Sequence, residues 1–191
     1  MSKARLLGTV GLMAFACFAV SGPDTEAHGP SQTAADLIRE AAGSDVAFLA
    51  AGMLKSTFNP SDLSTLVRFP TDEIAILNLK GSQIKAALER SVALYPSPSD
   101  SFLQLSNVEA TFTKNAEPDK RVVRVMVGGA PLDSGRTYTV AMPSSLARGG
   151  LGYFKVWDRN QLKTTLEKVT LESVLEGKSA RESAPRWRIQ N

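Results

Sequence analysis

The chain contains a single cysteine, Cys17, so no disulfide within the chain can hold its fold together. A stable structure must therefore come from a hydrophobic core, and 43% of the 191 residues are hydrophobic, 21% charged and 7% aromatic. This is the composition of one ordinary globular domain. Because the formal net charge is only +3, the composition gives no argument for binding to nucleic acid.

The same scarcity limits metal and nucleophile chemistry. Zinc and two-metal hydrolase sites usually recruit several His or Cys ligands, and this chain has one of each, His28 and Cys17. A Ser-His or Cys-His catalytic pair is equally hard to build, since His28 lies so near the N-terminus. We therefore expect no metal site, no cofactor and no catalytic residue in this chain.

The N-terminus has the pattern of an export signal. Lys3 and Arg5 precede an apolar stretch over residues 6–20, which a Ser-Gly-Pro sequence then interrupts. The stretch is shorter than the roughly 20 apolar residues that a transmembrane helix needs, and no later segment approaches that length. We therefore expect export to the periplasm or the extracellular space and no membrane span.

Two cleavage points fit this signal, one after Ser21 and one after Ala27. Cys17 adds a minor alternative, a lipoprotein anchored through its sulfur, although the preceding Ala-Phe-Ala is a weak match to a lipobox. We divide the chain into a signal and cleavage region over residues 1–27 and a single domain over residues 28–191.

Helix and strand patterns alternate along this domain. Capping residues followed by apolar positions three and four residues apart indicate helices, and short apolar runs bounded by Gly, Pro, Asn or Asp indicate strands. Beyond Trp157 only helix is expected before a last short strand. Such mixed blocks predict an α+β domain, with mixed sheets and packed helices. The strand over 121–127 alternates poorly, which predicts burial of both its faces. The expected helices cover residues 34–42, 63–67, 82–92 and 171–175, and the expected strands cover residues 46–50, 73–80, 102–106, 108–113, 121–127, 137–141 and 187–189.

Three stretches carry a resemblance to a known family. Residues 34–55 contain Ala-Asp-Leu-Ile-Arg-Glu-Ala-Ala-Gly-Ser-Asp-Val-Ala-Phe-Leu, residues 62–91 contain Leu-Lys-Gly-Ser-Gln-Ile-Lys, and residues 102–153 end in Gly-Gly-Leu-Gly-Tyr. In this order and spacing they resemble the C-terminal domain of the 5'-nucleotidase family, the module that follows a metallophosphoesterase domain in periplasmic and cell-surface nucleotidases. The resemblance covers nearly the whole expected mature chain and implies a mixed α/β layered sandwich.

The resemblance also implies a link to nucleotide hydrolysis, without catalysis by this chain alone. In the family, Asp, His and Asn side chains of the N-terminal domain hold two metal ions that activate water against a phosphate. No part of the 191 residues resembles that domain. The family's C-terminal domain contributes substrate recognition: a nucleobase stacks between two aromatic rings, and polar side chains contact base, ribose or phosphate.

The recognition residues of the family are only partly matched here. Phe69 stands at the first stacking ring, but Ser145 stands at the second, and Leu151 replaces an acidic residue of the Gly-rich segment. The family's Asn-Gly-Gly-Gly-Ile-Arg loop reads Ala-Ala-Gly-Met-Leu-Lys over residues 50–55, so Lys55 keeps the charge of the Arg but not its bidentate fork. The resemblance therefore implies a degenerate site for a nucleotide or nucleoside. Its candidate residues are Lys55, Phe69, Ser145, Gly149, Gly150 and Leu151.

Each candidate also has a purely structural interpretation. Most aromatic rings pack in a core, which favours a core position for Phe69 under the adjacent helix. Lys55 is expected to be a solvated loop lysine. Gly149 and Gly150 are equally typical of a tight turn, because a bare Gly-Gly-x-Gly is a weak nucleotide signal.

Two features at the ends of the domain have similar alternatives. We expect His28 to lie in disordered N-terminal sequence rather than to bind a ligand. Arg181, Arg186 and Arg188 with Trp187 form either an interaction patch or, as we expect, a solvated terminal strand.

Three functions remain open. The first is an exported, free-standing domain that has drifted from efficient nucleotide recognition. The second is an accessory subunit that supplies this domain in trans to a separate metallophosphoesterase chain. The third is a protein-interaction module on the same scaffold. A different ligand is a related alternative, since the same domain arrangement is found in the sulfur-oxidising thiosulfohydrolases, and fold analogy alone does not choose among these.

Overall fold

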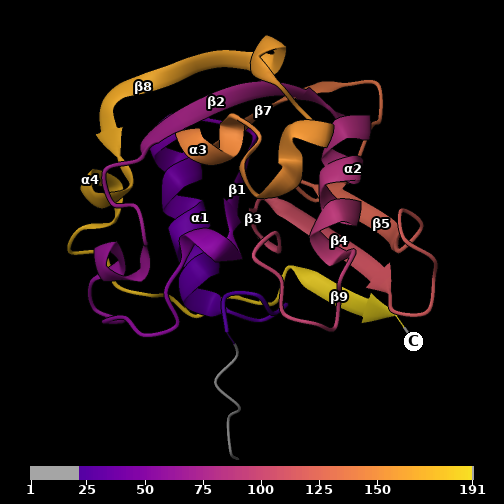
Figure 1. Ribbon diagram of the computed structural model, residues 1–191, viewed down its shortest axis with the longest axis horizontal. Helices are drawn as coiled ribbons and strands as arrows, with labels where there is room; N and C mark the ends of the chain where they lie inside the picture. Colours follow the sequence, from indigo (N-terminus) through magenta and orange to yellow (C-terminus); the bar gives the residue numbers. More distant parts are fainter. Residues whose placement is uncertain (1–21, 191) are drawn as a thin grey trace, which may run out of the picture.

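The computed structural model of the chain describes residues 22–190. The apolar stretch of the expected export signal and Cys17 therefore lie outside the described residues. Within the described part, no helix is both long enough and apolar enough to cross a membrane. The strands of this part form two sheets with helices packed against them, which confirms the α+β prediction (Figure 1).

The larger sheet has its strands in the order β3-β1-β7-β2-β8. β1 and β7 run parallel, and the other neighbouring pairs run antiparallel. All residues of β1 are buried, as expected for an apolar run in a central strand that is covered on both faces. The strands are β1 (Val46–Ala50), β2 (Glu73–Lys80), β3 (Leu103–Ser106), β7 (Thr137–Pro143) and β8 (Leu162–Thr170).

The smaller sheet has the order β6-β5-β4-β9, with β9 parallel to β4. Asn107, which has a left-handed φ of 58°, joins β3 to β4 and so carries the chain from one sheet to the other. Asn is among the residues that tolerate this conformation best. The strands are β4 (Val108–Thr113), β5 (Val122–Val127), β6 (Ala130–Pro131) and β9 (Trp187–Gln190).

Two long helices pack against these sheets. α1 (Gly29–Ala42) lies on β1 and β3, and α2 (Gly81–Val92) lies on β2 and β5. The predicted apolar stripe of α2, from Ile84 to Val92, is buried. The shorter helices are α3 (Ser144–Ala147), α4 (Leu171–Leu175) and the 3-10 turns η1 (Ala51–Met53), η2 (Leu63–Leu66), η3 (Gly150–Lys155) and η4 (Arg159–Gln161).

α1 begins earlier than the sequence predicts, and this corrects the expectation for His28. Pro30 occupies the first turn of the helix, where its missing N–H is not needed. His28 stands at the N-cap position and is 6% exposed. Its Nδ1 lies 2.5 Å from Oγ of Ser31, and its ring packs edge-on against Phe58. The prediction that His28 belongs to disordered sequence is therefore wrong.

Two strands also differ from prediction. β8, which runs along the top of Figure 1 beside β2, lies where only helix was expected. It is the outermost strand of its sheet and is mostly exposed, so its sequence lacks the apolar alternation that marks a strand. In β5, Val123 and Arg124 are exposed, so the prediction that both faces are buried is wrong.

The C-terminal strand belongs to the core. Trp187, the first residue of β9, is 1% exposed, and its ring packs against Phe102 and Phe112 with centroids 5.4 and 5.7 Å away. Its indole N–H donates to the carbonyl of Leu103 at 2.8 Å. The expectation of a solvated terminal strand is therefore wrong for Trp187, which ties the strand to both sheets, although Arg188 and Gln190 are exposed.

Candidate functional site

The topology of the larger sheet brings three loops to one edge. β1 and β7 are parallel, so both end at this edge, and β2 starts there because it runs antiparallel to β7. The loop after β1 contains Lys55, the segment before β2 contains Phe69, and the loop after β7 contains Ser145 and residues 149–151. We call this the loop edge of the sheet. All candidate residues of the sequence analysis therefore lie on segments that meet there.

The loop after β1 and the segment before β2 are joined by backbone hydrogen bonds. The Lys55 N–H donates to the Leu66 carbonyl, and the Arg68 N–H donates to the Met53 carbonyl, both at 2.8 Å. Nε of Arg68 also donates to the Leu54 carbonyl at 2.6 Å. Lys55 itself is exposed. The structure therefore fixes the backbone on either side of Lys55 and leaves its ammonium group in solvent.

Phe69 opens a tight turn and is 54% exposed. The Asp72 N–H donates to the Phe69 carbonyl at 3.0 Å, and the turn is attached to α4 by the Glu172 N–H, which donates to the Pro70 carbonyl at 2.9 Å. The turn is thus attached to α4 through its backbone, and the Phe69 ring stays outside the hydrophobic core. The expectation that Phe69 is a core ring is wrong, and its face is open to solvent at the loop edge.

Ser145 is paired with a residue that sequence reasoning missed. Its hydroxyl donates to Oδ2 of Asp72 at 2.6 Å, and its backbone N–H lies 3.2 Å from the same oxygen. Because Ser145 lies in the first turn of α3, the Asp72 carboxylate satisfies an N–H that the helix leaves unpaired. A hydroxyl–carboxylate pair therefore stands where the family resemblance implies a second ring. Nothing in the sequence around Asp72 indicates this contact, which depends on the pairing of β2 with β7.

The Gly-rich segment is shaped by packing. Gly149 has a left-handed φ of 89°, and a Cβ there would lie 2.7 Å from Cα of Phe154. A Cβ on Gly150 would lie 2.8 Å from the Ser145 carbonyl oxygen. Leu151 is half-buried and adopts a φ of 56°. These glycines are therefore required by the local chain path, as the tight-turn interpretation holds.

Buried aromatic residues anchor this segment. The Tyr153 ring stacks on Trp157 with centroids 4.7 Å apart, and its hydroxyl donates to the Ser101 carbonyl at 2.6 Å. Burial raises the pKa of Tyr153 far above its ordinary value, so the phenol stays protonated. The guanidinium of Arg90 lies over the same ring and donates to the Leu151 carbonyl. These contacts hold the loop after β7 against α2 and against the segment just before β3.

A pocket of about 360 Å³ adjoins the loop after β1. It has one cation, Arg68, and two carboxylates, Asp24 and Asp100, so its charge is mixed. Gly52, the one glycine left in this loop, is packed against Asp100, because a Cβ there would lie 2.8 Å from the Asp100 Cβ. The rest of the lining is Pro23, Ala51, Leu54, Ser56, Pro98 and Ser99.

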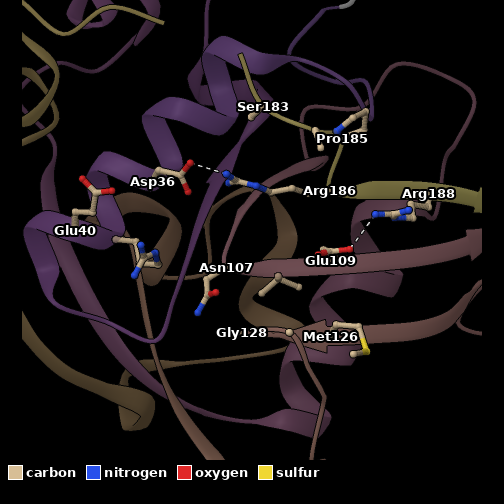
Figure 2. A pocket seen from close by; sticks show the side chains of 14 residues that line it. Asp36, Glu40, Asn107, Glu109, Met126, Gly128, Ser183, Pro185, Arg186 and Arg188 are labelled. Atoms are coloured by element: carbon tan, nitrogen blue, oxygen red, sulfur yellow. Dashed lines mark hydrogen bonds and ion pairs between the residues drawn. The ribbon is translucent and has the colours of Figure 1, made fainter. Parts of the chain in front are cut away.

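A second pocket, of about 410 Å³, lies at the opposite edge of the larger sheet, near Asn107 (Figure 2). It contains Arg186 and Arg188 of the predicted arginine cluster, each with an acidic partner, whereas Arg181 lines a different pocket. Arg186 pairs with Asp36 of α1, and Arg188 pairs with Glu109 of β4 at 3.2 Å. Arg186 and Arg188 are therefore charge-compensated in the folded protein.

No group of three or more His, Cys, Asp or Glu side chains among residues 22–190 is placed to hold a metal ion.

The chain is similar to known proteins in both sequence and fold. Residues 18–159 match the family described as 5'-nucleotidase, C-terminal domain. The 5'-nucleotidase of Mus musculus is 34% identical over 91 residues, which cover 44% of this chain and 16% of that protein.

Among solved structures, a 5'-nucleotidase precursor from Thermus thermophilus superposes with a TM-score of 0.70 at 24% identity, covering 85% of this chain and 35% of that one. The sulfate thiohydrolase SoxB from the same organism gives a TM-score of 0.63 at 23% identity, covering 83% and 31%. The chain thus spans about a third or less of the length of these relatives. Since the family match takes in well over half of its residues, this chain belongs to the 5'-nucleotidase C-terminal domain family.

Proposed function

We propose that this protein is an exported member of its family that binds a nucleoside or nucleotide weakly through Phe69, and that the residues of this chain do not hydrolyse it on their own. The observation that carries the proposal is the exposed ring of Phe69 at the loop edge. A ring face in water gains about 1–3 kcal/mol when a nucleobase stacks on it. The position of Phe69 in the sequence is the one at which the family resemblance implies a stacking ring.

The substituted residues support weak binding. Ser145 offers no second ring, and its hydroxyl is already bonded to Asp72. Leu151 supplies no side-chain acceptor for a base or ribose, and Lys55 offers an ammonium in place of a guanidinium fork. Each lost stacking or polar contact is worth about 1–3 kcal/mol, so the combined loss weakens binding by several kcal/mol.

The remaining parts of the proposal rest on the sequence. One histidine and one cysteine in the chain support the absence of a catalytic two-metal centre of its own. Lys3, Arg5 and the apolar stretch behind them support export, with the periplasm or the extracellular space as destination.

Calorimetric titration of the exported protein with adenosine, AMP and UDP-glucose tests the proposal. Phe154 is a matched control, because it is a second phenylalanine with a largely exposed ring, at 65%. We expect weak binding by the wild type and by Phe154→Ala, and none by Phe69→Ala. Silence of a folded wild-type protein with all ligands, or equal binding by all variants, would contradict the proposal.

A second candidate is an accessory subunit that works in trans. The observation that favours it is that the matching relatives carry this domain as about a third or less of a longer chain. The test is to mix the exported protein with a metallophosphoesterase chain that lacks this domain and to measure release of phosphate from AMP. A rise in rate that saturates with added protein supports the candidate, and an unchanged rate contradicts it.

A further inference from the structure

Residues 22–27, which we call the N-terminal strap, fold back onto the domain. Gly22 to Glu26 are half-buried. The N–H and hydroxyl of Thr25 both donate to the Gly22 carbonyl, at 3.1 and 2.7 Å, and close a turn. Pro23 and Asp24 line the pocket that adjoins the loop after β1. The strap therefore forms one wall of a pocket at the loop edge.

A fully buried glutamine depends on this strap. Gln104 of β3 is 0% exposed, and its Nε2 donates to the carbonyls of Pro23 and Thr25 at 2.8 and 2.9 Å. Its Oε1 has no hydrogen-bond partner among the described residues. Removal of the strap would thus take away both carbonyls to which the Gln104 amide donates. In the folded protein the strap thus supplies the hydrogen bonds that this buried amide needs.

Glu26 makes a second set of contacts. Its carboxylate accepts from the Tyr95 hydroxyl at 3.3 Å, and its backbone carbonyl accepts from Nε2 of Gln32 at 3.4 Å. Burial and the nearby Glu26 carboxylate raise the pKa of Tyr95. The strap is thus bonded to α1, to β3 and to the segment after α2.

The two cleavage points differ in where they leave a new ammonium group. Cleavage after Ala27 would place it on His28, at the N-cap of α1, where the helix dipole already presents positive charge. Cleavage after Ser21 would place it on Gly22, at the start of the strap, and would keep the contacts with Gln104, Tyr95 and Gln32. Ala19 and Ser21 supply the small residues that a signal cleavage site needs before Gly22.

We propose that the mature protein begins at Gly22 and retains the strap. In this step a signal peptidase hydrolyses the Ser21–Gly22 peptide bond with water, which leaves a carboxylate on Ser21 and an amine on Gly22. The inference rests on the proposed export, and it selects one of the two cleavage points that the sequence leaves open. It also makes Asp24 a permanent part of the pocket wall.

The test is to express the full 191-residue chain, collect the exported and the cytoplasmic fractions, and determine the N-terminus of each by intact mass and N-terminal sequencing. We expect the exported protein to begin at Gly22. An exported protein that begins at His28, or a lipid-modified one that begins at Cys17, overturns the inference and leaves export intact. A chain that stays in the cytoplasm from Met1 overturns the proposed export as well.

A matched pair of variants sharpens this test, because a large residue directly before the cleaved bond blocks processing. Ser21→Leu should abolish cleavage before Gly22. Ala27→Leu should leave that cleavage unchanged, so that the mature protein still begins at Gly22 and differs in mass from the wild type only by the substitution. The reverse pattern overturns the inference. Hydrogen exchange of the exported protein gives an independent readout, since the Thr25 amide should exchange more slowly than in an unstructured peptide if the strap is folded.

Discussion

The hydroxyl of Ser145 donates a hydrogen bond to the carboxylate of Asp72 at 2.6 Å and thereby joins the loop after β7 to the start of β2. The backbone N–H of Ser145 points to the same carboxylate. The position that the family resemblance assigns to an aromatic ring is thus occupied by a polar pair that closes the loop edge. This one relationship has consequences for stability and for ligand binding.

Asp72→Ala should destabilise the protein by about 1 kcal/mol, because α3 loses the carboxylate that pairs with its first-turn N–H. The measurement is the free energy of unfolding in urea. Asp158→Ala is the control, since Asp158 makes the same kind of bond to Asn160 in η4, a turn without buried residues. We expect Asp158→Ala to lower the free energy of unfolding by less than Asp72→Ala does. An equal or larger loss would show that the Asp72 contact contributes no more to stability than this contact in η4.

Ser145→Phe should strengthen nucleoside binding, because it places a second ring at the loop edge while the backbone N–H keeps its bond to Asp72. A second stack is worth about 1–3 kcal/mol of binding free energy. Ser145→Ala separates the new ring from the lost hydroxyl and should give no gain. If the two variants bind adenosine equally, the position does not face the ligand.

The single histidine makes the pH dependence of stability simple to assign. Burial lowers the pKa of His28 below its ordinary value of 6.5, so the folded state binds this proton less readily than the unfolded state. The contribution of His28 to the free energy of unfolding is therefore fully present above pH 6.5. It is lost as the pH falls below that value toward the lowered pKa of the folded state. Between about pH 7.5 and 5.5, the melting temperature should fall more for the wild type than for His28→Gln. A parallel fall in both would contradict this assignment.

Two glycines with similar backbone conformations separate backbone strain from packing. Gly152 has a φ of 82° and its missing Cβ would overlap the guanidinium of Arg90, whereas Gly177 has a φ of 65° and open space around it. Ala at either position meets a left-handed backbone penalty of roughly 1–2 kcal/mol. Gly152→Ala should lose more stability than Gly177→Ala in a urea titration, because it also displaces Arg90. Equal losses would mean that the Arg90 contact contributes nothing measurable.

Local patterns predicted the regular elements well. The strand over residues 73–80 and the stripe of α2 were predicted because apolar spacing alone determines them. β8 was missed for a physical reason: an outer strand with both faces partly in water needs no apolar alternation. β9 was predicted as a strand, but its burial depends on Phe102 and Phe112, which are distant in sequence.

The candidate site was harder to predict than the fold. The resemblance selected Phe69 and Ser145, and strand pairing explains why their loops meet. The exposure of Phe69 could not be read from the sequence, since it depends on how its turn packs on α4. The contact between Asp72 and Ser145 could not be predicted either, because it arises from the register of β2 against β7.

Stacking of a nucleobase on the ring of Phe69 can be measured directly from the NMR resonances of that ring. NMR spectra of the exported protein are recorded during titration with adenosine, and the ring protons of Phe69 and Phe154 are followed. We predict progressive shifts at Phe69, little change at Phe154, and loss of all adenosine-dependent shifts in Phe69→Ala. Unshifted Phe69 resonances up to the solubility limit of adenosine, or shifts that persist in Phe69→Ala, would contradict such stacking.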